Sequence, residues 1–242
     1  MATKKKAIVA SGFAALTPQS DKGSRLSQEE LRESMGHARP SLGDLDKIKI
    51  PSGGTRYWSI GEEDVKEFEA IIVAAQDVRM WYATKYSGGN EPPDCMSLDL
   101  RHGIVGENCP DEITGDCATC PKAQWGTAVN DKGEPTKGKA CSERKQMLIF
   151  RENDLAPLFM SIPPSSLKEV QGYINRLVPT GEAFWSVVTK FSLRKEKNDS
   201  GIDYSQVELE MVRPLTDEEL KSMRLLRAQF TETVETTSAL PE

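Results

Sequence analysis

The sequence has no long hydrophobic run and no clear targeting segment. No apolar stretch approaches the roughly 18 residues that indicate a transmembrane helix. Lysines near the N-terminus precede a mildly apolar run, but Ser11 and Gly12 interrupt that run and it is poor in leucine, unlike a signal peptide. We therefore expect a cytoplasmic protein that is neither secreted nor embedded in a membrane.

Recognisable catalytic machinery is also missing. The chain has only two histidines, neither with an obvious partner, and it lacks GxSxG, HExxH and a Gly-rich phosphate loop before a helix. The acidic residues Asp217, Glu218 and Glu219 lie at an expected helix start, where capping and the helix dipole explain them. These absences argue against an enzyme.

Length and charge set wider bounds. The 242 residues suffice for one substantial domain with insertions or for two small ones. A hydrophobic fraction of 38% and a charged fraction of 28% suit a soluble globular protein with some loose segments. The net charge of −6 does not indicate nucleic-acid binding, but such binding depends on a local stripe of cations rather than on the total charge.

All five cysteines lie in one stretch, residues 94–141, which is rich in Gly, Pro, Asp, Asn, Lys and Thr. Cys117 and Cys120 form a CxxC pair, and two thiolates at this spacing can grip one tetrahedral cation from a single turn. Cys141 follows the pair, and Cys95 or Cys109 precedes it. Because the stretch has too few apolar side chains to build a core, we expect a structural zinc to order it, although four thiolates also suit iron.

Other uses of these cysteines fit less well. Their odd number and the absence of a secretion signal disfavour disulfides, and no βαβ pattern precedes the CxxC as a redox motif would require. The fourth ligand stays open at this point. Spacing alone favours Cys109, which closes a smaller loop to Cys117 than Cys95 does, and His102 offers a nitrogen in place of either.

Alternating and apolar patterns predict a mainly β protein. Expected strands cover residues 47–50, 55–60, 68–86 with a break near Gln76 and Asp77, 145–150, 158–162, 183–193 and 203–215. Capping boxes predict helices that begin at Ser27, at Ser166 and at Thr216, the last one ending near Phe230. Strands with one interposed helix fit an OB-like, five-stranded barrel that carries the four-cysteine zinc ribbon or knuckle as an insertion.

The expected organisation has three parts. Residues 1–45 form a flexible arm with a short helix, and residues 46–213 form the OB-like domain with the zinc-bearing insertion at about 90–143. Residues 214–242 form a C-terminal helix and a disordered tail.

Four segments carry a resemblance to a known group: CMSLD at 95–99, CATCPKAQWGTA at 117–128, GKACSERKQMLIF at 138–150 and IPPSSLKEVQGYINRL at 162–177. They resemble phage-encoded single-stranded-DNA-binding proteins, in which a zinc-bearing insertion interrupts an OB-like barrel. The resemblance covers roughly residues 45–213. It implies Cys95, Cys117, Cys120 and Cys141 as the zinc ligands, and a protein that coats single-stranded DNA in the host-cell cytoplasm during replication, recombination or repair.

A single-strand coat binds through phosphate charge and base stacking, without strong sequence preference. Candidate stacking rings are Trp81, Tyr82, Trp125 and Trp185, although any of them can equally be a packing residue. The candidate cations cluster around the cysteine stretch and the expected hairpins: Arg79, Lys85, Lys122, Lys137, Lys139, Arg144, Lys145, Lys190, Arg194, Lys195 and Lys197. The alternative is a zinc-ribbon adaptor that docks to a replication or transcription assembly and does not bind nucleic acid itself.

Overall fold

A computed structural model describes residues 45–84, 92–107, 109–111, 113, 115–130, 133–152, 154, 156–198 and 201–237. The expected capping box at Ser27, the expected nucleic-acid contact Lys85 and the last five residues fall outside these ranges. The described chain is mainly β with two long helices, α2 (Pro164–Leu177) and α3 (Asp217–Thr237), which confirms the expected fold class at that level.

Within the described residues, ten strands form one sheet, whose main path runs in the order β10-β9-β4-β7-β8-β1-β2-β3, with β5 and β6 added beside β4. Each recorded pairing between strands is antiparallel except that of β1 with β8. The strands are β1 (Lys47–Lys49), β2 (Trp58–Ile60), β3 (Glu63–Val65), β4 (Glu67–Trp81), β5 (Cys95–Ser97), β6 (Ile104–Val105), β7 (Ser142–Arg151), β8 (Leu158–Ile162), β9 (Val187–Lys197) and β10 (Asp203–Pro214).

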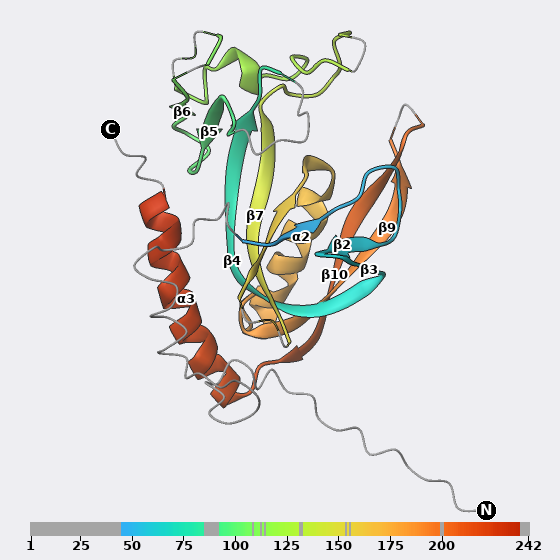
Figure 1. The fold of residues 1–242 in the computed structure, drawn as a ribbon, viewed down its shortest axis with the longest axis vertical. Helices are drawn as coiled ribbons and strands as arrows, with labels where there is room; N and C mark the ends of the chain where they lie inside the picture. The colour runs from blue at the N-terminus through green and yellow to red at the C-terminus, as the bar shows by residue number, and fades with distance from the viewer. Residues whose placement is uncertain are drawn as a thin grey trace, which may run out of the picture.

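The sheet curls into a half-barrel (Figure 1). Its curvature brings the connection between β1 and β2 against β10, the strand at the far edge. Ser52 forms an isolated bridge with Tyr204, and the Ser205 hydroxyl donates a hydrogen bond to the Thr55 carbonyl over 2.8 Å. The described sheet contains more strands than the five that the sequence led us to expect, because the short strands β1, β2 and β3 extend one end of its path and β5 and β6 are added beside β4.

The concave face of the sheet holds the main core. Trp58 is fully buried, and its ring lies edge-on to Phe68 at 5.4 Å between centroids, while Phe68 stacks on Phe191 at 4.8 Å. Helix α2 (Pro164–Leu177) fills the hollow and adds Val170 and Tyr173 to this core. Figure 1 shows α2 enclosed by the curved strands.

The start of α2 differs from the sequence-based prediction. Pro163 is the N-cap and provides no side-chain hydrogen bond, so the predicted capping box of Ser166 and Glu169 is wrong. Ser166 already lies inside the helix, where its buried hydroxyl accepts a hydrogen bond from the backbone nitrogen of Val207 at 3.0 Å. The backbone N–H of Val207 at the edge of β10 needs an acceptor, and the Ser166 hydroxyl accepts from it instead of capping the helix.

Helix α3 (Asp217–Thr237) covers the other face of the sheet through Met223, which packs with Ile71 and Val73 of β4. Its predicted capping box is confirmed: Thr216 N donates to Glu219 Oε2 at 2.8 Å, and Glu219 N donates to Thr216 Oγ1 at 3.3 Å. The helix continues past the expected end, so part of the tail that we expected to be disordered is helical. Along the described chain, no helix is both long and apolar enough to cross a bilayer.

Strands β4 and β7 form a long antiparallel pair that carries the cysteine stretch at one end. The break expected near Gln76 does not occur, because β4 is continuous and its register shift falls between Ile72 and Ala74. The last residue pair of this ladder is Met80 with Ser142. The insertion thus takes the place of a hairpin turn and lies beyond the strand ends at one end of the molecule (Figure 1).

Candidate metal centre and nucleic-acid interface

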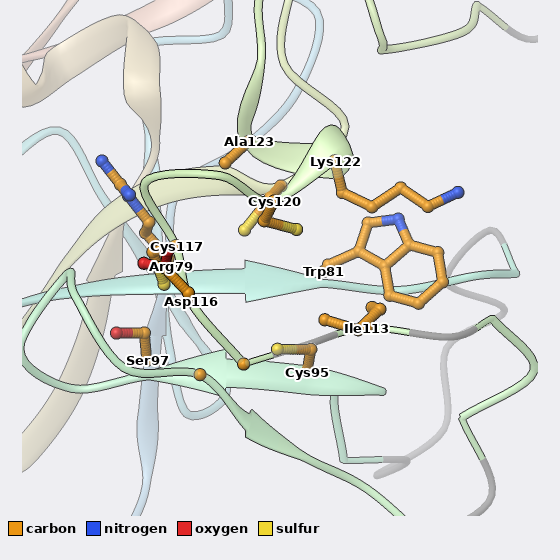
Figure 2. Close-up of a pocket in the computed structure, with 13 residues that line it drawn as sticks. Arg79, Trp81, Cys95, Ser97, Ile113, Asp116, Cys117, Cys120, Lys122 and Ala123 are labelled. Carbon is orange, nitrogen blue, oxygen red and sulfur yellow. The ribbon is translucent and has the colours of Figure 1, made fainter.

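Four of the cysteines converge on one pocket at the end of the β4–β7 pair. Cys95 lies on β5 opposite Trp81, Cys117 and Cys120 come from a tight turn, and Cys141 directly precedes β7. All four are buried and line the pocket, which is shown with Cys95, Cys117 and Cys120 labelled in Figure 2. Four cysteines from distant parts of the sequence therefore line one pocket.

The CxxC turn is shaped by the residue before it, Asp116. Cys120 N donates to the Asp116 carbonyl at 3.0 Å, Ala118 N donates to Asp116 Oδ1 at 3.1 Å, and the Thr119 hydroxyl donates to Asp116 Oδ2 at 2.7 Å. These bonds, led by that from Thr119, hold the pKa of Asp116 below its usual value. Asp116 thus stays ionised and fixes the turn in which two thiols are presented together.

The other cysteine positions are fixed by backbone contacts. Cys141 N donates to the Lys122 carbonyl at 2.7 Å, and Cys117 N donates to the Arg101 carbonyl at 2.9 Å. Gly103 lies against Cys95, where an added Cβ would meet Sγ at 2.9 Å. A side chain at position 103 would therefore push the Cys95 thiol out of place.

One alternative ligand, Cys109, packs against the cluster that holds Cys95, Cys120 and Cys141, and the other, His102, is exposed. Cys109 is only partly buried, does not line the pocket, and its thiol donates to the Asp111 carbonyl at 3.3 Å. His102 Nδ1 lies 2.6 Å from Asp99 Oδ2, and its side chain is 84% exposed. Hydrogen bonds from His102 hold the pKa of Asp99 well below its usual range. The placement favours Cys95 as the fourth thiol.

The four thiols are ligands that suit a soft divalent cation. In this structure, however, they are not arranged for metal coordination. All five cysteines are free. In the described ranges, no group of three or more His, Cys, Asp or Glu side chains is arranged to hold a metal ion. The zinc site is therefore a proposal. The four cysteine side chains share a pocket, and they would have to move closer together to coordinate an ion.

The buried pocket favours neutral thiols over free thiolates. Burial, followed by the neighbouring cysteines, raises the pKa of the Cys95 thiol to about 11 and that of Cys141 to about 12. Arg79 also lines the pocket, and its Nε is buried without a hydrogen-bond partner among the residues described. The Arg79 Nε–H group could donate a hydrogen bond to a metal-bound thiolate, which carries the negative charge that a free thiol lacks.

Most of the expected nucleic-acid cations pair with carboxylates. On the β9–β10 hairpin, Lys190 lies 2.5 Å from Glu210, and Arg194 contacts both Glu196 and Glu208. Lys195 and Lys197 both face Asp203. These cations form a cross-strand ladder with acidic neighbours, so the hairpin is close to neutral.

Near the insertion, the pattern is similar. Arg79 and Lys139 share Glu143, Lys122 lies 2.5 Å from Asp111, and the buried Lys145 lies 2.6 Å from Asp77. Arg144 donates to the Ser142 hydroxyl over 3.4 Å. In the part of the chain that the structure describes, the exposed Lys137 has no ion-pair partner.

The four expected stacking rings divide into two kinds. Trp81 is 5% exposed and packs among the cysteines with Lys122 over its ring, and Trp185 is partly buried under Arg227. Trp125 is 76% exposed, with Lys139 Nζ 4.9 Å from its ring centroid, and Tyr82 is 37% exposed. Only the second pair presents a ring surface on which a base can stack.

Tyr57 is an exposed aromatic residue that the sequence analysis missed. Its side chain is 54% exposed and lies on the connection that reaches the β9–β10 hairpin, whereas the neighbouring Trp58 is fully buried. Strand alternation through residues 55–60 offered the signal, because it places consecutive rings on opposite faces. The missing information was which face is buried.

Comparison of this chain with protein-family models, with curated proteins and with solved structures finds no significant match.

Proposed function

We propose that this protein binds single-stranded DNA without strong sequence preference and coats it during phage-type replication, recombination or repair. The observation that carries the proposal is Trp125, a large ring that is 76% exposed beside Lys139. Stacking on an exposed ring contributes about 1–3 kcal/mol per base regardless of base identity. The exposed ammonium group of Lys137 in the same insertion attracts the phosphates of the same strand.

The structural role of zinc is part of this proposal. Cys95, Cys117, Cys120 and Cys141 would hold the ion, and four thiolates leave no coordination position for a reacting water, so we propose no catalysis. A bound ion would fix the positions of the turns that carry Lys122 and Trp125. The OB-like character of the domain also remains a proposal, which the curled sheet supports in outline.

The ion pairs favour a particular distribution of binding strength. Because Lys190, Arg194, Lys195 and Lys197 already face carboxylates, a phosphate would have to compete for them. We therefore assign the larger share of binding to the insertion, where the exposed Lys137 and Trp125 lie close in sequence. The same neutral hairpin is the observation that favours the second candidate, an adaptor that binds a protein partner instead of DNA.

The test is fluorescence anisotropy with labelled oligo-dT and a duplex of equal length, each at two salt concentrations. We expect tighter binding to the single strand, and weakening by salt as counterions are no longer released into a dilute solution. Trp125→Ala should weaken binding about 10-fold, as expected for the loss of one stacked base. Val129→Ala, which changes another exposed apolar residue of the same loop, should not. Folded, zinc-loaded protein that ignores oligo-dT at low salt would contradict DNA binding and favour the adaptor.

A further inference from the structure

Glu143 receives two cations that belong to different parts of the insertion site. Its Oε1 lies 2.9 Å from Arg79 Nη2 and 3.2 Å from Lys139 Nζ. Arg79 sits directly opposite Glu143 in the β4–β7 ladder, and Lys139 precedes it by four residues. One carboxylate on a rigid strand thus sets the position of both cations.

The two cations lead in different directions. Lys139 Nζ reaches the exposed Trp125, 4.9 Å from the ring centroid. Arg79 lines the same pocket as the four cysteines. A series of contacts therefore runs from the pocket of the four cysteines through Arg79, Glu143 and Lys139 to Trp125.

Charge balance at the metal site explains why a cation lies at the start of this series of contacts. Four thiolates around one zinc ion carry a net charge of −2, and a buried net charge is costly unless cations or hydrogen bonds compensate it. Arg79 and Lys122 are the cationic side chains that line the pocket. Lys122 is held at 2.5 Å by Asp111 and lies over Trp81, whereas Arg79 keeps its buried Nε without a hydrogen-bond partner within the described residues.

We propose that Arg79 is a positioning residue that compensates the charge of the metal-bound thiolates, and that Glu143 couples it to the orientation of the Trp125 ring through Lys139. Metal loading and the presentation of the stacking ring are then linked. This inference rests on the proposed zinc site but not on DNA binding, so it is tested without DNA.

The metal half of the test uses cobalt, whose thiolate complexes absorb visibly and report on the charge around the sulfur atoms. We expect Arg79→Gln to weaken Co²⁺ binding by roughly 10- to 100-fold, the usual effect of removing an outer partner of metal ligands, and to shift the sulfur-to-cobalt absorption band. Arg144→Gln is the matched control. It removes the same charge one residue away from Glu143 on β7, and consecutive strand residues point to opposite faces.

The ring half of the test measures acrylamide quenching of tryptophan emission, taken as the difference between each protein and its Trp125→Phe counterpart. In the wild type, adding or removing metal should change the quenching of Trp125. In Glu143→Gln, the quenching should no longer respond to metal, because the link between Arg79 and Lys139 is lost. Glu208→Gln breaks a comparable ion pair with Arg194 on the distant hairpin and should keep the response.

The outcomes separate the two proposals. Wild-type protein that binds no Co²⁺ would overturn both the metal site and this coupling. Equal Co²⁺ affinity in Arg79→Gln and Arg144→Gln would overturn the role of Arg79 while leaving the metal site intact. If Arg79→Gln loses its fold by circular dichroism, Glu143→Gln decides the matter, and an unchanged metal response of Trp125 in that variant would overturn the coupling.

Discussion

The hydroxyl of Ser166 lies 3.0 Å from the backbone nitrogen of Val207, and both residues are fully buried. These residues are 41 positions apart, on α2 and on β10. β10 is the last strand of the sheet path, so this N–H points away from β9 and needs an acceptor. A helix side chain supplies the acceptor that a further strand would otherwise provide.

Ser166→Ala should destabilise the fold by about 1–3 kcal/mol, because it leaves a buried N–H without a partner. The loss is measured as a lower urea midpoint at an unchanged m-value. Ser165→Ala is the control, since Ser165 is exposed and only its carbonyl, which the substitution keeps, accepts from Gln206. Equal stability of the two variants would contradict this role for Ser166.

Cys95→Ser and Cys109→Ser should differ in metal content. Cys95 is buried in the pocket, whereas Cys109 lies outside its lining. We expect Cys109→Ser to keep one zinc per chain, and Cys95→Ser to lose most of its zinc during dialysis against a mild chelator. Atomic emission on the purified proteins gives the ratio. The opposite result would assign the fourth position to Cys109.

Thr216→Ala should destabilise the protein by about 1 kcal/mol, because Thr216 is one half of the capping box that begins α3. Urea unfolding followed by helical circular dichroism measures this loss. Ser222→Ala serves as the control within the same helix. The Ser222 hydroxyl donates only to the Glu218 carbonyl of its own helix, and alanine is a better helix former than serine. A comparable loss in both variants would show that the cap contributes nothing specific.

Tyr173 should make the protein less stable at alkaline pH. Its hydroxyl lies 2.6 Å from Thr189 Oγ1, and burial raises the pKa of Tyr173. The folded state then holds a proton that the unfolded state releases above its usual pKa of about 10, so this stability is complete at lower pH and declines as pH rises. Tyr173→Phe should flatten the alkaline decline relative to the wild type, whereas Tyr57→Phe, at an exposed ring, should not. If the stability of all three proteins declined in parallel at alkaline pH, this role of Tyr173 would be refuted.

Local patterns were sufficient for the elements whose determinants are local. Apolar alternation predicted β8 and the β9–β10 hairpin, and the Thr216 and Glu219 pair predicted the start of α3, because their interactions join neighbours in the chain. The same pattern failed at Ser166, where a distant strand edge competes for the hydroxyl. Capping residues are therefore informative only when no buried backbone group lies within reach of them.

The cysteine spacing by itself determined that two thiols come from one turn, since CxxC geometry is local. Only the tertiary structure placed Cys95 and Cys141 beside them, because β5 and the start of β7 both flank the end of β4. It also decided which expected cations are available. The sequence identifies a lysine or a tryptophan but not its neighbours across a sheet. Here most of the expected cations face carboxylates. Trp81 is buried in a core, whereas Trp125 is exposed to solvent.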